Sequence, residues 1–363
     1  MASIGVAIIG AGGIALANHL PGIALCHDAR LVAVCDSDPA TLERARRQTG
    51  AAIASADWRD VVAHDAVDAV IICTPNHVHA PIALAAIAAG KHVLCEKPIA
   101  MNTAEALAMW QAAEQRGVRH MTAFTYRFVP AMRYLAHLVA AGAIGEPRHF
   151  RVQRMQDWGT RDLGWRQQQR FAASGELGDM LSHRIDYAHL LVGPIARLSA
   201  DTRQFVAERD GRPADVEDWV AILAAFANGA TGVMESTKLA TGCGEGKDSP
   251  DRCEVNGSEG TLVYQLGQPH HILRADASDR GLRVEAVPAE FLCHPGSPRD
   301  PAAGDPLVTF RYDQAIEFIA AIREARPCVP SFAAGCAVQA VMDAALRAAA
   351  DRCWINVAYP VLS

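Results

Sequence analysis

The first 120 residues alternate short, continuously apolar runs with alanine-rich stretches of helical length. Continuous apolar runs are typical of parallel strands, because helices bury both faces of a parallel sheet. The pattern therefore predicts a doubly wound α/β domain. Its expected strands are residues 4–10, 31–35, 67–73, 92–95 and 118–122.

The pattern changes after Phe124 to longer runs in which apolar and polar residues alternate. Such alternation is typical of antiparallel strands with one face exposed to solvent. The runs are residues 148–156, 216–227, 230–239, 252–255 and 261–265. We predict a first domain of residues 1–123 and a second, α+β domain of residues 124–363 that is built on a large, mostly antiparallel open sheet. The length of 363 residues agrees with two separate cores, since single cores rarely exceed about 300 residues.

The last third of the chain contains one segment without periodicity and two with helical periodicity. Residues 276–305 are rich in proline, glycine and charge, which predicts an irregular excursion. Residues 309–325 and 332–350 have apolar positions at helical spacing and are predicted to be helices.

A glycine-rich turn directly follows the first predicted strand. Gly10, Gly12, Gly13 and Ile14 belong to the pattern G-x-G-x-x-A, which opens an alanine-rich helix. Small residues let the backbone turn sharply and approach a pyrophosphate at the helix N-terminus. Asp36 ends the second strand, 24 residues beyond Gly12 (36 − 12), close to where the acid that binds the adenosine ribose is expected. Together these features predict a dinucleotide-binding Rossmann domain.

The carboxylate of Asp36 also predicts which dinucleotide binds. It would accept hydrogen bonds from the ribose hydroxyls and would repel a 2′-phosphate. NAD is therefore favoured over NADP. Arg44 or Arg46 could still reach a phosphate, so NADP stays open as the less favoured cofactor.

Two further strands run into loops of unusual chemistry. One loop contains Thr74, Pro75, Asn76 and His79, and the other is Glu96-Lys97-Pro98. Ligands of open α/β sheets bind beyond the carboxyl ends of the strands, so both loops should face the cofactor. A solvated surface cation is the alternative for Lys97, but the adjacent proline and apolar strand favour a fixed position.

A polar stripe is predicted on a helix in the second domain, between Gly178 and Gly193. Asp179 and His183 are four residues apart and share one helical face, with Asp186 close to the same face. Spacing alone leaves a solvated Asp–His pair open as the alternative.

With these motifs the chain resembles the Gfo/Idh/MocA oxidoreductases (glucose-fructose oxidoreductase and inositol dehydrogenase) over nearly its whole length. The resemblance implies that Lys97 is the active-site lysine, often followed by a cis peptide bond to Pro98. It also implies that Thr74, Pro75, Asn76, His79, Glu96 and Arg127 lie near the cofactor. The sheet of the second domain would serve for dimerisation, as a homodimer or homotetramer.

The resemblance predicts hydride transfer between a nicotinamide cofactor and a hydroxyl-bearing carbon of a sugar or polyol. Alcohol oxidation needs a base with a pKa near the working pH, for which His183 is the candidate. Asp179 would orient the imidazole or hold a substrate hydroxyl, and Lys97 would stabilise the developing alkoxide. Lys97 as the base itself is the alternative within the same scheme.

Trp165 and Arg166 are the candidates for substrate recognition, because aromatic faces stack on sugars and arginine binds hydroxyls or carboxylates. A tryptophan between the domains and a surface arginine are the plainer alternative. The pattern of this region resembles the branch that oxidises anhydrosugars, inositols and related cyclic polyols. Lys238 stands where that branch often has arginine, which puts its part in substrate binding in doubt.

Two other functions are compatible with the same scaffold. One is a glycosidase that retains NAD and cleaves a sugar linkage through transient oxidation. The other is a dinucleotide or sugar sensor without catalysis, although such proteins can discard the lysine and histidine that Lys97 and His183 supply here.

The composition of the chain argues against several classes of binding partner. The net charge of −6 is spread along the chain, without the basic stripe that nucleic acids or anionic membranes attract. The ten cysteines form no CxxC pair, and His77 with His79, or His270 with His271, lack the further ligands of a metal site. We expect reduced thiols, no metal, no membrane or nucleic-acid partner, and a cytoplasmic location, also because the opening residues lack a basic leader.

Overall fold

The computed structural model describes residues 3–246 and 249–362. Its contacts divide the chain into two compact units. The first unit runs to Thr125 and also takes in His294–Cys336 and the residues from Pro360 onward. The second unit comprises Tyr126–Cys293 and Ala337–Tyr359.

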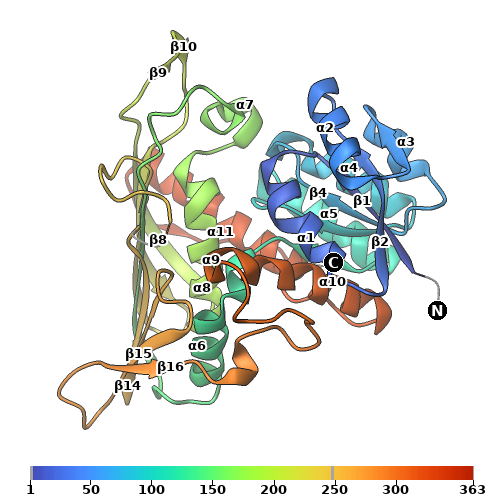
Figure 1. Ribbon diagram of the computed structural model, residues 1–363. Helices are drawn as coiled ribbons and strands as arrows, with labels where there is room; N and C mark the ends of the chain where they lie inside the picture. The colour runs from blue at the N-terminus through green and yellow to red at the C-terminus, as the bar shows by residue number, and fades with distance from the viewer. Residues whose placement is uncertain (1–2, 247–248, 363) are drawn as a thin grey trace. The chain divides into compact units, whose positions relative to one another are not determined.

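The sheet of the first unit is parallel and has the strand order of a dinucleotide-binding fold. Within the described residues its order is β3-β2-β1-β4-β5-β6, and every neighbouring pair is parallel. The strands are β1 (Ile4–Ile9), β2 (Ala29–Cys35), β3 (Ile53–Ser55), β4 (Ala69–Ile72), β5 (His92–Cys95) and β6 (His120–Thr122). Five of these six were predicted; β3 was missed because three half-exposed or exposed residues carry no apolar run. The sheet and its helices are blue to cyan in Figure 1.

Helices α2 (Pro39–Thr49), α3 (Trp58–Ala63), α4 (His79–Ala88) and α5 (Thr103–Arg116) connect these strands. The Asp38 carboxylate caps α2 by accepting the Thr41 N–H, and the Asn102 side chain caps α5 in the same way. The α4 and α5 helices pack on an apolar core with the strands, which includes Val70, Ile82 and Met109. The carboxyl ends of β1, β4 and β5 are thereby held in fixed register.

Residues 294–336 pack with the first unit, whereas the sequence placed them in a continuous second domain of residues 124–363. Helix α10 (Asp313–Arg323) lies so close to α1 (Leu20–Ala24) that a Cβ on Gly22 would come within 2.9 Å of the Ala315 Cβ. The Arg323 guanidinium also donates to the Asp28 carbonyl oxygen at 2.8 Å. Phe332 and Cys336 complete the apolar core. Tertiary packing of this kind leaves no trace in local periodicity.

The second unit is built on a large sheet, which within the described residues has the order β16-β15-β14-β13-β7-β12-β11-β8-β17. Its pairs are antiparallel except for the parallel pair of β7 and β12, as predicted for a mostly antiparallel sheet. The predicted strands are β7 (Pro147–Met155), β11 (Trp219–Phe226), β12 (Thr231–Thr237), β13 (Asp251–Gly257) and β14 (Gly260–Gln265). The sequence missed β8 (Ile195–Arg203), β15 (His271–Asp276), β16 (Arg283–Ala286) and β17 (Ile355–Asn356).

The expectation for residues 276–305 was wrong in part, because this segment contains β16 and the short 3-10 helix η6 (Ala289–Phe291). All four residues of β16 pair with β15, but three of them are exposed and one is half-buried, so backbone pairing rather than burial stabilises this strand. The two predicted helices are present as α10 and as α11 (Phe332–Asp351).

The two faces of the large sheet differ. Helices α6 (Pro130–Ala140) and α8 (Ser182–Leu191) pack against one face, where Phe150 and Tyr264 are buried (Figure 1). On the other face, directly paired residues form a row across the sheet. In strand order this row is Leu223, Val233, Arg151, Glu254, Val263, Leu273 and Val284.

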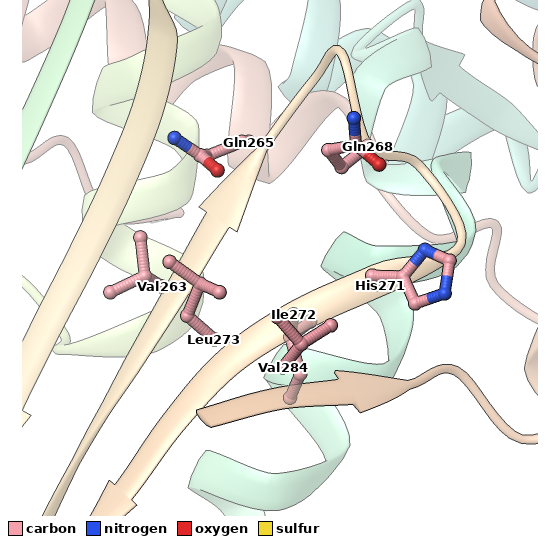
Figure 2. A pocket seen from close by; sticks show the side chains of 7 residues that line it. All are labelled: Val263, Gln265, Gln268, His271, Ile272, Leu273 and Val284. Carbon is pink, nitrogen blue, oxygen red and sulfur yellow. The ribbon is translucent and has the colours of Figure 1, made fainter. Parts of the chain in front are cut away.

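Two hollows open along this row. One, of about 440 Å³, is lined by residues that include Leu223, Val233 and Trp354. The other, of about 230 Å³, is shown in Figure 2, where Val263, Leu273 and Val284 lie beside Gln265 and His271. Leu223, Val233 and Val284 are 52%, 40% and 70% exposed, so this face presents apolar surface to solvent.

Helix α11 is long and apolar enough, by length and composition alone, to cross a membrane. Its most apolar stretch is 61% buried, however, which is typical of a core helix. Phe332, Val341 and Ala345 are each fully buried.

Candidate functional site

The glycine turn has the geometry that a dinucleotide requires. Gly10 has a φ of +89°, and a Cβ there would lie 2.7 Å from the backbone carbon of Cys73. Only glycine fits a position that combines positive φ with such a close approach. A Cβ on Gly12 or Gly13 would meet no atom within 4 Å. The turn therefore packs tightly against the residues that follow β4 and leaves open space at Gly12 and Gly13, as pyrophosphate binding needs.

Asp36 ties the glycine turn to the end of β2. Its Oδ2 accepts the Ala11 N–H at 2.9 Å, and its Oδ1 accepts the Asp38 N–H at 2.9 Å. The carboxylate is thus held beside the turn, where the sequence placed the ribose-binding acid. Ile14, the next residue predicted to face the cofactor, is 37% exposed at the start of the first helical segment.

The two predicted loops of the first unit are joined by the His79 ring. Its Nε2 lies 2.9 Å from the Thr74 carbonyl oxygen and its Nδ1 lies 2.9 Å from the Pro98 carbonyl oxygen. The ring is fully buried, and this burial lowers its pKa, against the two carbonyl contacts. Both ring nitrogens face carbonyl oxygens within the protein, and the ring holds the loops in register. The Lys97–Pro98 peptide bond is cis, which confirms what the resemblance implied.

Glu96 has a partner that the sequence reasoning missed. The Nε2 of His19, in the π-helical turn η1 (Ala15–His19), lies 2.8 Å from Glu96 Oε1. Burial would lower the pKa of His19, but Cys73 and Glu96 outweigh burial and raise it to about 10. Burial would likewise raise the pKa of Glu96, but His19 and Lys97 lower it. No motif marks His19, because its contact with Glu96 spans 77 residues.

In the second unit, the predicted helix begins differently from expectation. Its first turn is the π-helix η5 (Leu177–Leu181), and regular α-helix starts only at Ser182 in α8. π-helical turns have a wider spacing and are frequent at functional sites. Asp179 is half-buried, whereas His183 is only 3% exposed, with its ring 4.6 Å from the Tyr126 ring in an edge-to-face contact. The polar stripe is therefore not a solvated face.

Three of the predicted side chains come together in this unit. The Arg166 Nε lies 3.4 Å from Asp179 Oδ1, and the Arg166 guanidinium is stacked over the Trp165 ring at 4.3 Å. Trp165 and Arg166 belong to the short 3-10 helix η4 (Trp165–Gln167). The cluster combines an aromatic face with a charged pair that offers both donors and acceptors. Such a combination suits a polyhydroxylated ring.

Two other polar residues, Asp186 and Lys238, are buried and form contacts within the second unit. Asp186, expected on the stripe with Asp179, is 1% exposed and receives two hydrogen bonds from Arg127. Lys238 is also 1% exposed, with its Nζ 3.3 Å from Asp218 Oδ1 and 3.1 Å from the Glu217 carbonyl oxygen. The doubt about Lys238 in substrate binding thus has a structural basis.

No cluster of three or more His, Cys, Asp or Glu side chains suited to a metal occurs among residues 3–246 and 249–362. The ten cysteines, all within these ranges, are free thiols.

Known proteins with the same architecture match nearly the whole chain. Residues 4–124 match the model of an oxidoreductase family with an NAD-binding Rossmann fold, and residues 132–263 match the GFO/IDH/MocA C-terminal domain. Levoglucosan dehydrogenase of Pseudarthrobacter phenanthrenivorans is 35% identical over 353 residues, covering 89% of this chain and 88% of its own. Myo-inositol 2-dehydrogenase of Thermotoga maritima is 29% identical, covering 77% of this chain and 80% of its own.

A solved structure of levoglucosan dehydrogenase in complex with NADH and levoglucosan has a TM-score of 0.89 and 33% identity. The similarity covers 98% of this chain and 99% of that one. The family models, the relatives and the solved structure agree with the two-domain architecture described above. The chain belongs to the Gfo/Idh/MocA family of oxidoreductases, with an NAD-binding Rossmann domain as its first unit.

Proposed function

We propose that this protein is an NAD-dependent dehydrogenase that oxidises a hydroxyl-bearing carbon of a cyclic sugar or polyol, with anhydrosugars and inositols as the favoured substrates. The observation that carries the choice of substrate is the cluster of Trp165, Arg166 and Asp179. The names of the relatives, levoglucosan dehydrogenase and myo-inositol 2-dehydrogenase, support the same class.

The proposed mechanism assigns one task to each reactive side chain. His183 accepts the proton of the substrate hydroxyl, since a neutral imidazole is a base near neutral pH. Asp179 holds a substrate hydroxyl together with Arg166. Lys97 donates a hydrogen bond to the reacting oxygen and stabilises negative charge as it develops. When bound, NAD supplies the acceptor for the hydride.

The residues of the first unit fit that cofactor. Gly10, Gly12 and Gly13 provide a turn with open space beside it, and Asp36 places a carboxylate next to the turn. We propose that Ile14, Thr74, Pro75, Asn76 and Glu96 line the cofactor site, and that His79 acts there by fixing the two loops. The negative charge of Asp36 favours NAD over NADP.

The two other functions are less favoured. The relatives named above are dehydrogenases, one of them solved with NADH, which supports neither a glycosidase that retains its cofactor nor a sensor. Lys97 and His183, which a sensor does not need, are both present.

We further propose that two copies pair through the open face of the large sheet, as a homodimer or as half of a homotetramer. Apolar side chains on this face are exposed, and the hollows of Figure 2 and around Trp354 would receive side chains of the second copy. Arg151 and Glu254 lie in the same row and supply charges of opposite sign. Leu223→Asp with Val233→Asp would shift the mass in light scattering to that of a monomer; an unchanged mass would rule out this face.

A cytoplasmic location and the lack of nucleic-acid or membrane partners remain predictions from the dispersed charge of the chain. Fractionation of cells that express the protein would test them.

A substrate screen tests the proposed function directly. Purified protein with NAD is offered levoglucosan, myo-inositol, free aldoses, glycosides and sugar acids, and formation of NADH is followed by absorbance. We expect NADH from an anhydrosugar or inositol, with NADP used more slowly. Release of sugar from a glycoside without net NADH would establish the glycosidase instead, and binding of NAD without turnover of any compound would favour the sensor.

A further inference from the structure

Two adjacent carboxylates, Glu217 and Asp218, lie just before β11 in the second unit. Neither belongs to a motif, and the proposed mechanism uses neither. Each binds a different segment that carries proposed substrate residues.

Glu217 accepts hydrogen bonds from three consecutive backbone N–H groups. Its Oε1 accepts the Gly175 N–H at 2.8 Å and the Leu177 N–H at 2.9 Å, and its carbonyl oxygen accepts the Glu176 N–H at 3.2 Å. These are the amides at the start of the helix that contains Asp179 and His183. The first N–H groups of a helix have no partner inside the helix and need one elsewhere. Here the partner comes from the segment just before β11, 40 residues later in the chain.

The fit between the two segments is close. A Cβ on Gly175 would lie 2.0 Å from the Glu217 carbonyl oxygen, so only glycine allows this approach. The Asp179 N–H then donates to the Gly175 carbonyl oxygen at 2.9 Å. The position of Asp179 along the helix therefore depends on the contact between Gly175 and Glu217.

Asp218 binds the other segment through a chain of contacts. Its Oδ2 accepts the Phe205 and Val206 N–H groups at 2.8 and 2.9 Å, and its Oδ1 lies 3.1 Å from Arg209 Nη2. The Arg209 Nη1 in turn donates to the Gly159 and Arg161 carbonyl oxygens. Asp218 and Arg209 are 1% and 5% exposed, so little water competes for these contacts.

Lys238 also connects the Asp218 carboxylate to the start of the loop that contains Trp165 and Arg166. Its Nζ is 3.3 Å from Asp218 Oδ1 and 5.5 Å from the centre of the Trp158 ring. The Lys238 carbonyl oxygen accepts the Trp158 and Gly159 N–H groups at 3.0 and 2.7 Å. Six residues after Gly159, the loop presents Trp165 and Arg166.

We infer that Glu217 and Asp218 are positioning residues with separate tasks: Glu217 places the helix of Asp179 and His183, and Asp218 places the loop of Trp165 and Arg166. This inference rests on the proposed function, which gives those four side chains their roles. A group that transfers a proton must be placed within a fraction of an ångström, whereas a binding loop mainly governs affinity. Glu217 should therefore affect kcat and Asp218 should affect KM.

Variants of Glu217 separate reach from charge. Gln keeps the length and an acceptor oxygen, whereas Asp keeps the charge but is one methylene too short to serve both amides. We expect Glu217→Asp to lower kcat by about 10- to 100-fold, because misplacement of a reactive group by about 1 Å can cost that much. In Glu217→Gln, kcat should stay within about threefold of the wild-type value. KM for the sugar or polyol should rise by a smaller factor than kcat falls in Glu217→Asp, because Asp179 also holds a substrate hydroxyl, and should stay near the wild-type value in Glu217→Gln.

Asp218→Asn removes the charge that binds Arg209 and Lys238. We expect KM for the sugar or polyol to rise by about tenfold or more, the cost of one charge-assisted hydrogen bond, with kcat changed by less than about threefold. The matched control is Glu208→Gln, an exposed carboxylate in the neighbouring hairpin, which should change neither constant.

Hydrogen exchange measured by mass spectrometry provides a readout that needs no substrate. Amides of residues 175–179 should exchange faster in Glu217→Asp, and those of residues 159–168 faster in Asp218→Asn, with the remainder of the unit unchanged. If the wild-type protein oxidises none of the compounds screened, the proposed function fails while the exchange pattern still tests the placement. Equal effects of both variants on kcat and KM, a greater loss in Gln than in Asp at residue 217, or faster exchange throughout the unit would overturn the inference.

Discussion

The Arg127 guanidinium donates two hydrogen bonds of 2.6 Å to the Asp186 carboxylate, from Nε to Oδ2 and from Nη2 to Oδ1. The carboxylate is 1% exposed and the arginine side chain 15%. Burial raises the pKa of Asp186, and Arg127 opposes that rise. A pair of this kind fixes α8, which also contains His183, to the segment just before α6.

Arg127→Ala leaves a buried carboxylate without its partner. We expect the free energy of unfolding to fall by about 3–5 kcal/mol, as measured by urea denaturation. Arg203→Ala, which breaks the exposed pair with Asp201, is the control and should cost about 0–1 kcal/mol. Similar losses in the two variants would contradict a structural role for the Arg127–Asp186 pair.

Arg127 also remains a sequence-based candidate for cofactor binding. Arg127→Lys keeps the charge but not the two-pronged geometry, so NAD titration of this variant tests that assignment. Weaker NAD binding would support contact with the cofactor, and unchanged binding would leave the arginine with its structural role alone.

Replacing either reactive side chain should stop catalysis without preventing cofactor binding. Lys97→Ala or His183→Ala is expected to lower kcat by about 10²–10⁴-fold, the usual contribution of a positioned acid or base. NAD binding, measured by fluorescence titration, should be nearly unchanged. Lys91→Ala is the control lysine, with its Nζ donating to the His64 carbonyl oxygen. Wild-type turnover in both reactive variants would remove Lys97 and His183 from the mechanism.

Asp36 should determine the choice between NAD and NADP. Asp36→Ser removes the charge that repels a 2′-phosphate, so we expect kcat/KM for NAD to fall and that for NADP to rise. The Ala11 N–H also loses its acceptor, which should deepen the loss with NAD and offset part of the gain with NADP. A kinetic comparison with NAD and NADP checks this; an unchanged ratio would show that Asp36 does not contact the ribose.

Trp165→Ala should raise KM for the sugar or polyol, because the ring supplies the face on which Arg166 is stacked beside Asp179. Loss of aromatic stacking costs on the order of 1 kcal/mol, or about fivefold in KM. Trp58→Ala is the matched control, because it removes the same kind of stacked pair, with Arg59 at 4.4 Å, in the first unit. Unaltered kinetics in Trp165→Ala would exclude the ring from the substrate site.

Glu176 should make stability depend on pH. Ser236 Oγ lies 2.5 Å from Glu176 Oε1 and 3.1 Å from the Arg154 carbonyl oxygen. A hydroxyl has a single proton and a carbonyl can only accept, so when Ser236 donates to Arg154, Glu176 must carry a proton itself. Burial, followed by the charge of Asp179, raises the pKa of Glu176 to about 8, although Ser236 and Lys238 act to lower it.

In the unfolded chain Glu176 loses its proton near its ordinary pKa of 4.5, whereas the folded protein keeps the proton up to about pH 8. The contribution of Glu176 to the free energy of unfolding is therefore fully present below pH 4.5 and is lost as the pH rises to about 8. The loss amounts to about 1.4 kcal/mol for each unit by which the pKa of the folded protein exceeds that of the unfolded chain. Glu176→Gln should remove this loss in urea denaturation at about pH 5 and about pH 9. The same pH dependence in the variant and in the wild type would show that Glu176 is ionised in the folded protein.

Local sequence determined the features whose physical cause is local. The apolar runs set five strands of the parallel sheet, and the glycines of residues 10–13 with Asp36 set the dinucleotide turn, because strand burial and positive φ are properties of a few neighbouring residues. The Asp179 helix and the alternating strands of the second unit were predicted for the same reason.

Tertiary structure decided the contacts between residues far apart in the chain. His19 meets Glu96, Arg127 meets Asp186, and Glu217 meets the amides of Gly175 and Leu177 across 40 or more residues. The assignment of residues 294–336 to the first unit has the same origin. Periodicity reports only which face of an element is apolar; the partner of a buried charge depends on how whole elements pack.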